Sequence, residues 1–175
     1  MSAGRIAILG ILVTALVAGI ALYYLQVFAY YEEIPPEEAK VQLVNLSTGE
    51  PEDVRVENFQ GIDSGSSPIR YRACFDMGLS VPTLTETYEI YEEAVPLVAP
   101  GWFDCFDADE IGAALEDQAI AFLGEENIEY GVDRVVAVMP DGRAYAWNQL
   151  NRCGEVVFDG DPAPEGCPPA PEGYR

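Results

Sequence analysis

The sequence predicts an α+β protein with one N-terminal transmembrane helix and a small periplasmic domain that holds a mostly antiparallel sheet, one or two helices and two disulfides. Three observations support this class: an uncharged apolar run, short segments of alternating apolar and polar residues, and four cysteines that all follow the run. The expected organisation is a cytoplasmic N-terminus (1–5), a transmembrane helix (6–31), a linker (32–38), an acidic domain (39–159) and a proline-rich tail (160–175).

The apolar run, Ile6–Tyr31, contains no charged side chain. A bilayer core takes roughly 20 apolar residues in a helix, whereas the apolar stretch of a signal peptide has about 7–15 and ends at a small-x-small cleavage site. No such site precedes the polar sequence here, which favours an uncleaved anchor. Arg5 precedes the run and Glu32 and Glu33 follow it. Because positive charge stays in the cytoplasm, we expect the N-terminus inside and the domain outside.

Small side chains recur at spacings of three and four along the run. Packing rather than hydrophobicity drives helix association in lipid, so a small-residue stripe allows a second helix to approach closely. Small residues are also frequent in any membrane helix, and this interpretation stays open. We expect a partner helix to contact Ala7, Gly10, Thr14 and Ala18.

The part after the run is strongly acidic. All 30 acidic residues and eight of the nine basic ones lie at or after Glu32, which gives this part a formal net charge of −22. Phosphate groups require a basic face, so the charge argues against nucleic acid and against anionic lipid. It suits a basic protein partner, divalent cations, or solubility alone.

Alternation and turn residues predict the first strands of the domain. We expect strands at Lys40–Leu46, Val54–Glu57 and Ile69–Phe75, and a loop at Asn58–Ser67. In the third strand Arg70 and Arg72 share a face with Cys74, and we expect both arginines to neutralise neighbouring carboxylates. Thr83–Glu93 fits neither a strand nor a helix cleanly.

A helix and a hairpin are the clearest later elements. Asp107 with Glu110 three residues on matches a capping box, which predicts a helix from Ala108 to about residue 116. Gln118–Leu123 resembles a strand. Within Gly131–Leu150, an Asp-Gly pair between two β-prone runs predicts a hairpin.

Four cysteines in a domain placed outside the cytoplasm indicate two disulfides. Three pairings are possible, and we favour Cys74–Cys105 with Cys153–Cys167, the second of which would fix the proline-rich tail. Zinc sites and thioredoxin-type motifs usually bring cysteines in close pairs. The spacings here are 31, 48 and 14 residues, which disfavours both.

No sequence pattern indicates an active site. Histidine is absent, which removes the conventional catalytic triad and the commonest metal ligand, and there is no glycine-rich phosphate loop. Asp107–Glu110 and Asp159–Asp161 lack the spacing of a calcium loop. A carboxylate-based hydrolase would need two carboxyl groups with raised pKa values in one cleft. We therefore expect no enzyme activity, no cofactor and no metal.

A dense aromatic cluster surrounds Cys105, in Gly101-Trp-Phe-Asp-Cys-Phe106. Exposed aromatic residues often anchor protein interfaces. The alternative is that Trp102 and Phe103 fill the core beside the cysteine. The candidate docking residues are Trp102, Phe103, Asp104 and Asp107.

Four segments carry a resemblance to a known family: Leu22–Val27, Ser67–Phe75, Ala99–Phe106 and Asn151–Pro162. In these the chain resembles a group of small single-pass proteins from alphaproteobacteria related to Rhodobacter and Paracoccus, a domain family of unknown function. The resemblance covers nearly the whole chain. It implies a bacterial inner membrane and a periplasmic domain, and it implies no catalytic residues.

These features favour a non-catalytic accessory subunit or assembly factor of an inner-membrane respiratory complex of the cytochrome oxidase or bc1 type. The transmembrane helix would contact the complex, and the acidic domain would dock a basic cytochrome c, because complementary charge raises association rates. The alternative is a stand-alone periplasmic binding or envelope-scaffolding module.

Overall fold

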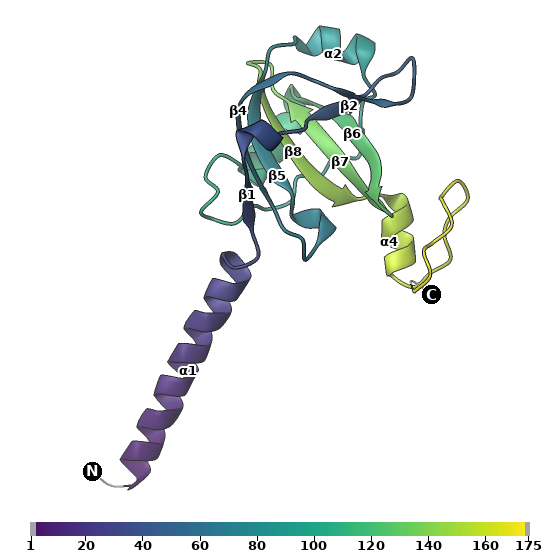
Figure 1. Cartoon of the computed structure of the whole chain (residues 1–175). Helices are drawn as coiled ribbons and strands as arrows, with labels where there is room; N and C mark the ends of the chain where they lie inside the picture. Colours follow the sequence, from purple (N-terminus) through teal and green to yellow (C-terminus); the bar gives the residue numbers. More distant parts are fainter. Residues whose placement is uncertain (1–2, 174–175) are drawn as a thin grey trace. The chain divides into compact units, whose positions relative to one another are not determined.

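The computed structural model describes residues 3–173 and divides the chain into two units, residues 1–31 and 32–175 (Figure 1). The first unit is an apolar helix. The second is a domain with a mostly antiparallel sheet, several helices and two disulfides, so the predicted fold class is confirmed.

Helix α1 (Ala3–Val27) has 25 residues, none of them buried. It is long and apolar enough to cross a membrane, which fits a membrane anchor or a signal sequence. The helix was expected at Ile6–Tyr31 but ends four residues earlier. A turn at Phe28–Tyr30 follows, because the next residues leave the helix to pair as a strand.

The main sheet contains six antiparallel strands in the described part of the chain. Their spatial order is β1 (Glu32–Ile34), β4 (Val56–Asp63), β5 (Arg72–Met77), β8 (Arg143–Leu150), β7 (Val132–Val138) and β6 (Ile120–Glu129). A separate antiparallel pair joins β2 (Gln42–Val44) to β3 (Pro51–Asp53). The predicted hairpin is β7–β8, with Val135 opposite Trp147 and a turn in which Gly142 has φ +91°.

Both faces of the central strands are covered, which gives the domain two hydrophobic cores. On one face Ala73 and Phe75 of β5 pack with Val136 and Val138 of β7 under Leu84. The other face carries the alternate residues of the same strands and lies under α3: Cys74, Val135, Ala137 and Trp147, with Ile111 and Phe106 above them. Because both faces are covered, most residues of β5, β7 and β8 are buried.

The described residues contain three α-helices in the domain, where one or two were expected. They are α2 (Val81–Thr87), α3 (Ala108–Asp117) and α4 (Arg152–Phe158), together with the 3-10 turns η1 (Pro36–Glu38) and η2 (Pro68–Arg70). The α3 prediction is confirmed, since Asp107 accepts hydrogen bonds from the amides of Asp109 and Glu110 at 3.0 Å. Helix α4 was not predicted; Asn151 caps it by accepting from the amides of Cys153 and Gly154.

Several other boundaries differ from the sequence expectations; residues 69–70, for example, were expected in the strand Ile69–Phe75 but lie in η2. Residues 32–38, expected to be a linker, contain β1 and η1, and β1 pairs with β4 from Glu32 opposite Asp63. The loop expected at Asn58–Ser67 begins only after Asp63, because the buried side chains of Phe59 and Ile62 hold β4 in the sheet. Local turn composition therefore yields to core packing at this strand.

Candidate functional site

The loop Gly101–Phe106, called here the aromatic-cysteine loop, is fixed to the sheet by a disulfide. Cys105 is joined to Cys74 of β5 with a Cα–Cα distance of 6.2 Å. Phe106, the last residue of the loop, is buried and packs edge-on against Tyr145 and Trp147, with ring centroids 6.0 and 6.2 Å apart. The covalent bond and the buried ring hold this loop in one position on the domain.

The two aromatic docking candidates lie in different surroundings. Phe103 is partly buried and packs against the core that contains Phe106. Trp102 is half-buried and meets Phe103 edge-on at 6.3 Å. The core interpretation thus holds for Phe103, whereas Trp102 is only half-buried.

A groove of about 370 Å³ lies beside this loop. Its apolar walls come from Ile34 of β1, Phe59 of β4 and the two loop aromatics. Gly61 leaves room for the Phe59 ring, because a Cβ at position 61 would lie 2.6 Å from that ring. The groove is lined by Glu33, Ile34, Pro36, Phe59, Gln60, Gly61, Trp102, Phe103, Asp104 and Cys105.

The acidic docking candidates separate in the structure. Asp104 is exposed and lines the groove with Glu33. Asp107 is exposed as well, but its Oδ1 caps α3 and it does not line the groove. Asp107 therefore has a structural task, and Asp104 is the carboxylate placed beside Trp102.

Negative charge covers the domain with little compensation. Of the 30 carboxylate side chains, 27 are exposed, the exceptions being Asp63, Glu125 and Asp133. Arg143 pairs with Asp141 at 2.8 Å and with Glu110 at 3.3 Å, and its hydrogen bond lowers the pKa of the Asp141 carboxyl. Such exposed pairs contribute little to stability.

Arg72 has a different task from the one expected. It is buried and donates to four backbone carbonyls, those of Ile69, Tyr71, Leu97 and Val98, at 2.7–3.2 Å. Its guanidinium also lies 5.7 Å from the Phe106 ring centroid. The arginine thus ties the 97–98 loop to β5 and removes a positive charge from the surface.

A buried carboxylate joins three elements, and the sequence reasoning missed it. Asp133 accepts from the Tyr91 hydroxyl at 3.2 Å, from the Asn127 amide at 2.9 Å and from Asn151 Nδ2 at 2.7 Å. Burial, and then the charge of Asp133, raise the pKa of Tyr91 well above its ordinary value. Three donors satisfy this carboxylate, so the cluster is structural. No sequence signal marks it beyond an acidic residue inside a β-prone run.

No metal site is evident in the structure of residues 3–173, because no group of three or more His, Cys, Asp or Glu side chains is placed to hold an ion. The small residues predicted for helix packing lie on one face of α1, within about 80° of arc at 3.6 residues per turn. Thr14 donates its hydroxyl to the Gly10 carbonyl at 2.8 Å, so the one polar group of the stripe is satisfied inside the helix. The stripe Ala7, Gly10, Thr14 and Ala18 stays a prediction.

Comparison with known proteins gives one match. Residues 41–168 match the model of a family of unknown function, DUF6446, and the chain belongs to this family. The matched region begins after α1 and contains all four cysteines. No curated protein and no solved structure matches the chain.

Proposed function

We propose that this member of the DUF6446 family is a non-catalytic accessory subunit or assembly factor of an inner-membrane respiratory complex. In this proposal α1 is an uncleaved anchor with its N-terminus in the cytoplasm, and the acidic domain lies in the periplasm of an alphaproteobacterium. The domain docks a basic cytochrome c that serves a complex of the oxidase or bc1 type.

The observation that carries the proposal is the exposed, uncompensated negative charge. Twenty-seven carboxylates are exposed, while Arg72 is buried, so one of the few positive charges is withdrawn from the surface. A surface of one sign steers oppositely charged proteins and raises association rates by 10–10³-fold at low salt. A carrier with a basic face is the chemical complement of this domain.

The groove beside the aromatic-cysteine loop supplies a candidate contact point. Interface energy concentrates at partly enclosed aromatic residues surrounded by polar ones. Trp102 has this setting, with Glu33 and Asp104 on the rim and a disulfide fixing the loop from behind. A rigid loop loses little conformational entropy on binding, which favours affinity.

The membrane placement rests on two further features. Arg5 precedes the apolar helix and acidic residues follow it, as the positive-inside rule requires for an external domain. Two disulfides, with no free cysteine among residues 3–173, suit an oxidising compartment outside the cytoplasm.

Titration of the full chain in detergent micelles with a basic cytochrome c tests the proposal. We expect binding that weakens steeply with ionic strength, because screening shortens the Debye length from about 30 Å at 0.01 M to about 8 Å at 0.15 M. Trp102→Ala and Asp104→Lys should each weaken it by about tenfold or more.

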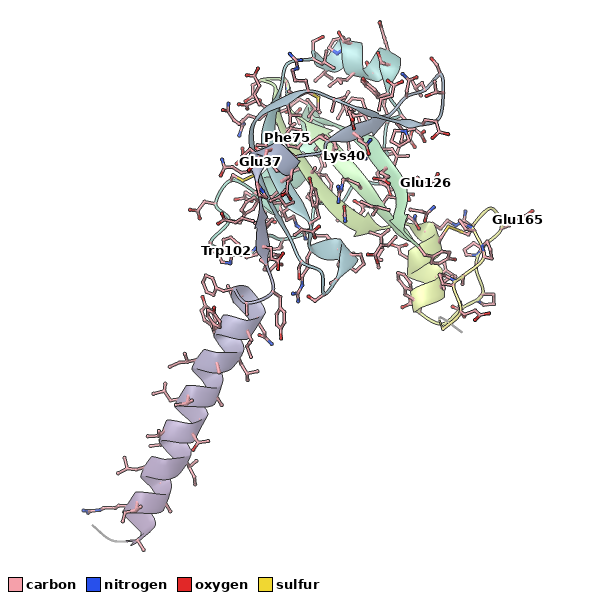
Figure 2. The ribbon with its side chains drawn as sticks, viewed as in Figure 1. Glu37, Lys40, Phe75, Trp102, Glu126 and Glu165 are labelled. Atoms are coloured by element: carbon pink, nitrogen blue, oxygen red, sulfur yellow. A yellow bond between two sulfur atoms is a disulfide. The ribbon has the colours of Figure 1, made fainter. Side chains whose placement is uncertain are left out.

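Glu165→Lys is the matched control for Asp104→Lys, since it makes the same charge change on the tail (Figure 2). Glu165→Lys should weaken binding far less. Equal losses for the two charge reversals would mean that the groove is not the contact point. Absence of binding at low salt would reject docking of a basic cytochrome c altogether.

A stand-alone periplasmic binding or envelope-scaffolding module is the second candidate. The observation that favours it is a polar cavity around Arg134 with the size of a small-ligand pocket. Recovery of the chain with envelope proteins, and without haem proteins, would support this candidate over the first.

A further inference from the structure

A polar cavity of about 370 Å³ lies between the end of β4 and the end of β6. It shares no lining residue with the groove beside the aromatic-cysteine loop. Its walls come from the turn after β4, from the end of β6, and from one residue each of β7 and β8. The lining residues are Asp63, Ser64, Gly65, Ser66, Ser67, Pro68, Ile128, Glu129, Arg134 and Asn148.

Arg134 is held firmly in this cavity wall. Its Nε donates to Asn148 Oδ1 at 2.9 Å, and its Cζ lies 3.7 Å from the ring centroid of Tyr71. Asn148 is itself buried and donates to the Pro68 carbonyl at 2.7 Å. Gly124 on the neighbouring strand leaves the arginine its space, because a Cβ there would lie 3.2 Å from Arg134 Cγ. Stacking on Tyr71 and one hydrogen bond to Asn148 therefore fix the Arg134 side chain, and Gly124 leaves room for it.

The outer edge of this guanidinium is unused. Within residues 3–173, its Nη1 and Nη2 groups make no hydrogen bond or ion pair, although 27 exposed carboxylates surround the domain. Two parallel N–H groups of this kind bind a carboxylate through two hydrogen bonds. The hydrogen bond to Asn148 uses Nε and the contact with Tyr71 uses the face of the guanidinium, so a purely structural clamp would not need the free Nη1 and Nη2 groups.

The same cavity also carries negative charge. Asp63 is half-buried, with Oδ1 accepting from the Ser64 amide at 2.7 Å, and Glu129, which is exposed, also lines the cavity. These two carboxylates would repel a ligand that is only anionic, and they would attract an ammonium group. The hydroxyls of Ser64 and Ser66 also line the cavity; they are hydrogen-bonded to each other at 2.8 Å, and Ser66 Oγ accepts from Arg70 Nη1 at 3.2 Å.

We propose that this cavity binds a small zwitterion of the amino-acid class. The carboxylate of the ligand pairs with Nη1 and Nη2 of Arg134, and its ammonium group lies toward Asp63 and Glu129. The proposal is independent of docking at Trp102, because the two sites share no lining residue.

The test is an NMR titration of the full chain in micelles, with the Arg134 Nε–Hε resonance as reporter. The probes are the common L-amino acids added one at a time, with acetate and methylammonium as half-ligands. We expect at least one amino acid to bind saturably with a Kd of about 1 mM or tighter, and acetate and methylammonium to bind at least about tenfold more weakly. Arg134→Lys lacks the two parallel N–H groups of the guanidinium and should weaken amino-acid binding by about tenfold or more.

Glu129→Lys keeps the experiment decisive even where Arg134→Lys impairs folding, since Glu129 is exposed. It should weaken amino-acid binding about tenfold and leave acetate binding equal or stronger. Glu126→Lys, on the same strand and outside the cavity (Figure 2), is the matched control and should change neither. Three outcomes would each overturn the proposal. The first is that no amino acid binds saturably, and the second is that acetate binds as tightly as any amino acid. The third is that Glu129→Lys and Glu126→Lys have equal effects.

Discussion

Gly131 and Gly154 pack backbone against backbone, and this contact docks α4 on the turn between β6 and β7. A Cβ on Gly131 would lie 2.7 Å from the Gly154 amide nitrogen, and Gly131 has φ +75°. The Gly131 carbonyl also accepts the Asn151 amide at 3.0 Å, immediately before α4 begins. Neither position has room for a side chain, so two glycines 23 residues apart determine where the last helix lies.

The glycine contact predicts an unusual response to alanine. A glycine inside a helix normally costs about 0.5–1 kcal/mol relative to alanine. Gly154→Ala should instead destabilise the domain by about 1–3 kcal/mol, because its methyl group would collide with the Gly131 backbone. Urea unfolding of the full chain measures this change.

Gly112→Ala in α3 is the matched control for the same substitution. A Cβ at Gly112 would meet only the Pro96 ring at an ordinary 3.7 Å, so this variant should be neutral or up to about 1 kcal/mol more stable. If both alanine variants raise stability, the backbone contact at Gly154 is not as close as described.

The disulfide Cys153–Cys167 should stabilise the tail more than the sheet. It spans 14 residues and joins α4 to the tail, which holds no helix or strand between residues 160 and 173. In the loop-entropy model a bridge of this size contributes about 3 kcal/mol. The double variant Cys153→Ala with Cys167→Ala should expose the tail to proteolysis after Gly160 while the hairpin β7–β8 stays protected.

The disulfide Cys74–Cys105 gives the contrasting case. Cys74 is buried in β5 and the bridge spans 31 residues, so its removal should lower the stability of the whole sheet by about 3–5 kcal/mol. Hydrogen exchange of the β5 amides would detect the loss. A tail-only effect for this pair would contradict the assigned role.

The Tyr91–Asp133 contact predicts a loss of stability in alkali. The folded-state pKa of Tyr91 is raised, first by burial and then by Asp133, above the value of about 10 in the unfolded chain. The contribution of Tyr91 to folding stability is therefore complete below about pH 10 and is lost as the pH rises further, because the tyrosine of the unfolded chain releases its proton first.

Tyr91→Phe should cost about 1–3 kcal/mol at neutral pH, since it removes one donor from the buried Asp133. The stability difference between the wild type and Tyr91→Phe should shrink between about pH 9 and pH 12. Urea unfolding across this range measures the difference directly, and burial-raised pKa values at Tyr71 and Tyr145 affect both proteins alike. A difference that stays constant with pH would show that Tyr91 does not titrate as described.

The small-residue stripe of α1 predicts a position-specific effect in the membrane. Gly10→Leu fills the predicted contact face and should abolish cross-linking to a neighbouring helix without preventing insertion. Gly19→Leu adds the same side chain about 120° away from Ala7 on the helix and should leave cross-linking unchanged. Equal behaviour of the two variants would remove the stripe as a contact face.

Much of the fold of the domain can be predicted from local sequence patterns. Asp107 caps the start of α3, and the Asp-Gly pair directly before β8 lies in the turn of the hairpin. The favoured cysteine pairs are the ones joined in the structure. Each of these signals acts over a few residues or comes from the count and spacing of the four cysteines.

What the sequence could not supply depends on contacts between distant segments. Residues 32–34 become a strand only because they pair with the edge of β4, where Glu32 lies opposite Asp63, 31 positions further along the chain. At the Arg134 site, Tyr71, Gly124 and Asn148 lie around one guanidinium. These residues come from distant segments, and no short sequence pattern predicts that they are neighbours. The separation of Asp104 from Asp107, three positions apart, likewise depends on where α3 begins.

Purification of the tagged full chain from gently solubilised native membranes tests the central proposal most directly. We predict that subunits of a cytochrome oxidase or bc1-type complex and a basic cytochrome c are recovered with it at low salt. Asp104→Lys should lose the cytochrome c, and Gly10→Leu should lose the membrane subunits. Recovery of the chain alone, or of the same proteins with every variant and at every salt concentration, would contradict the proposed function.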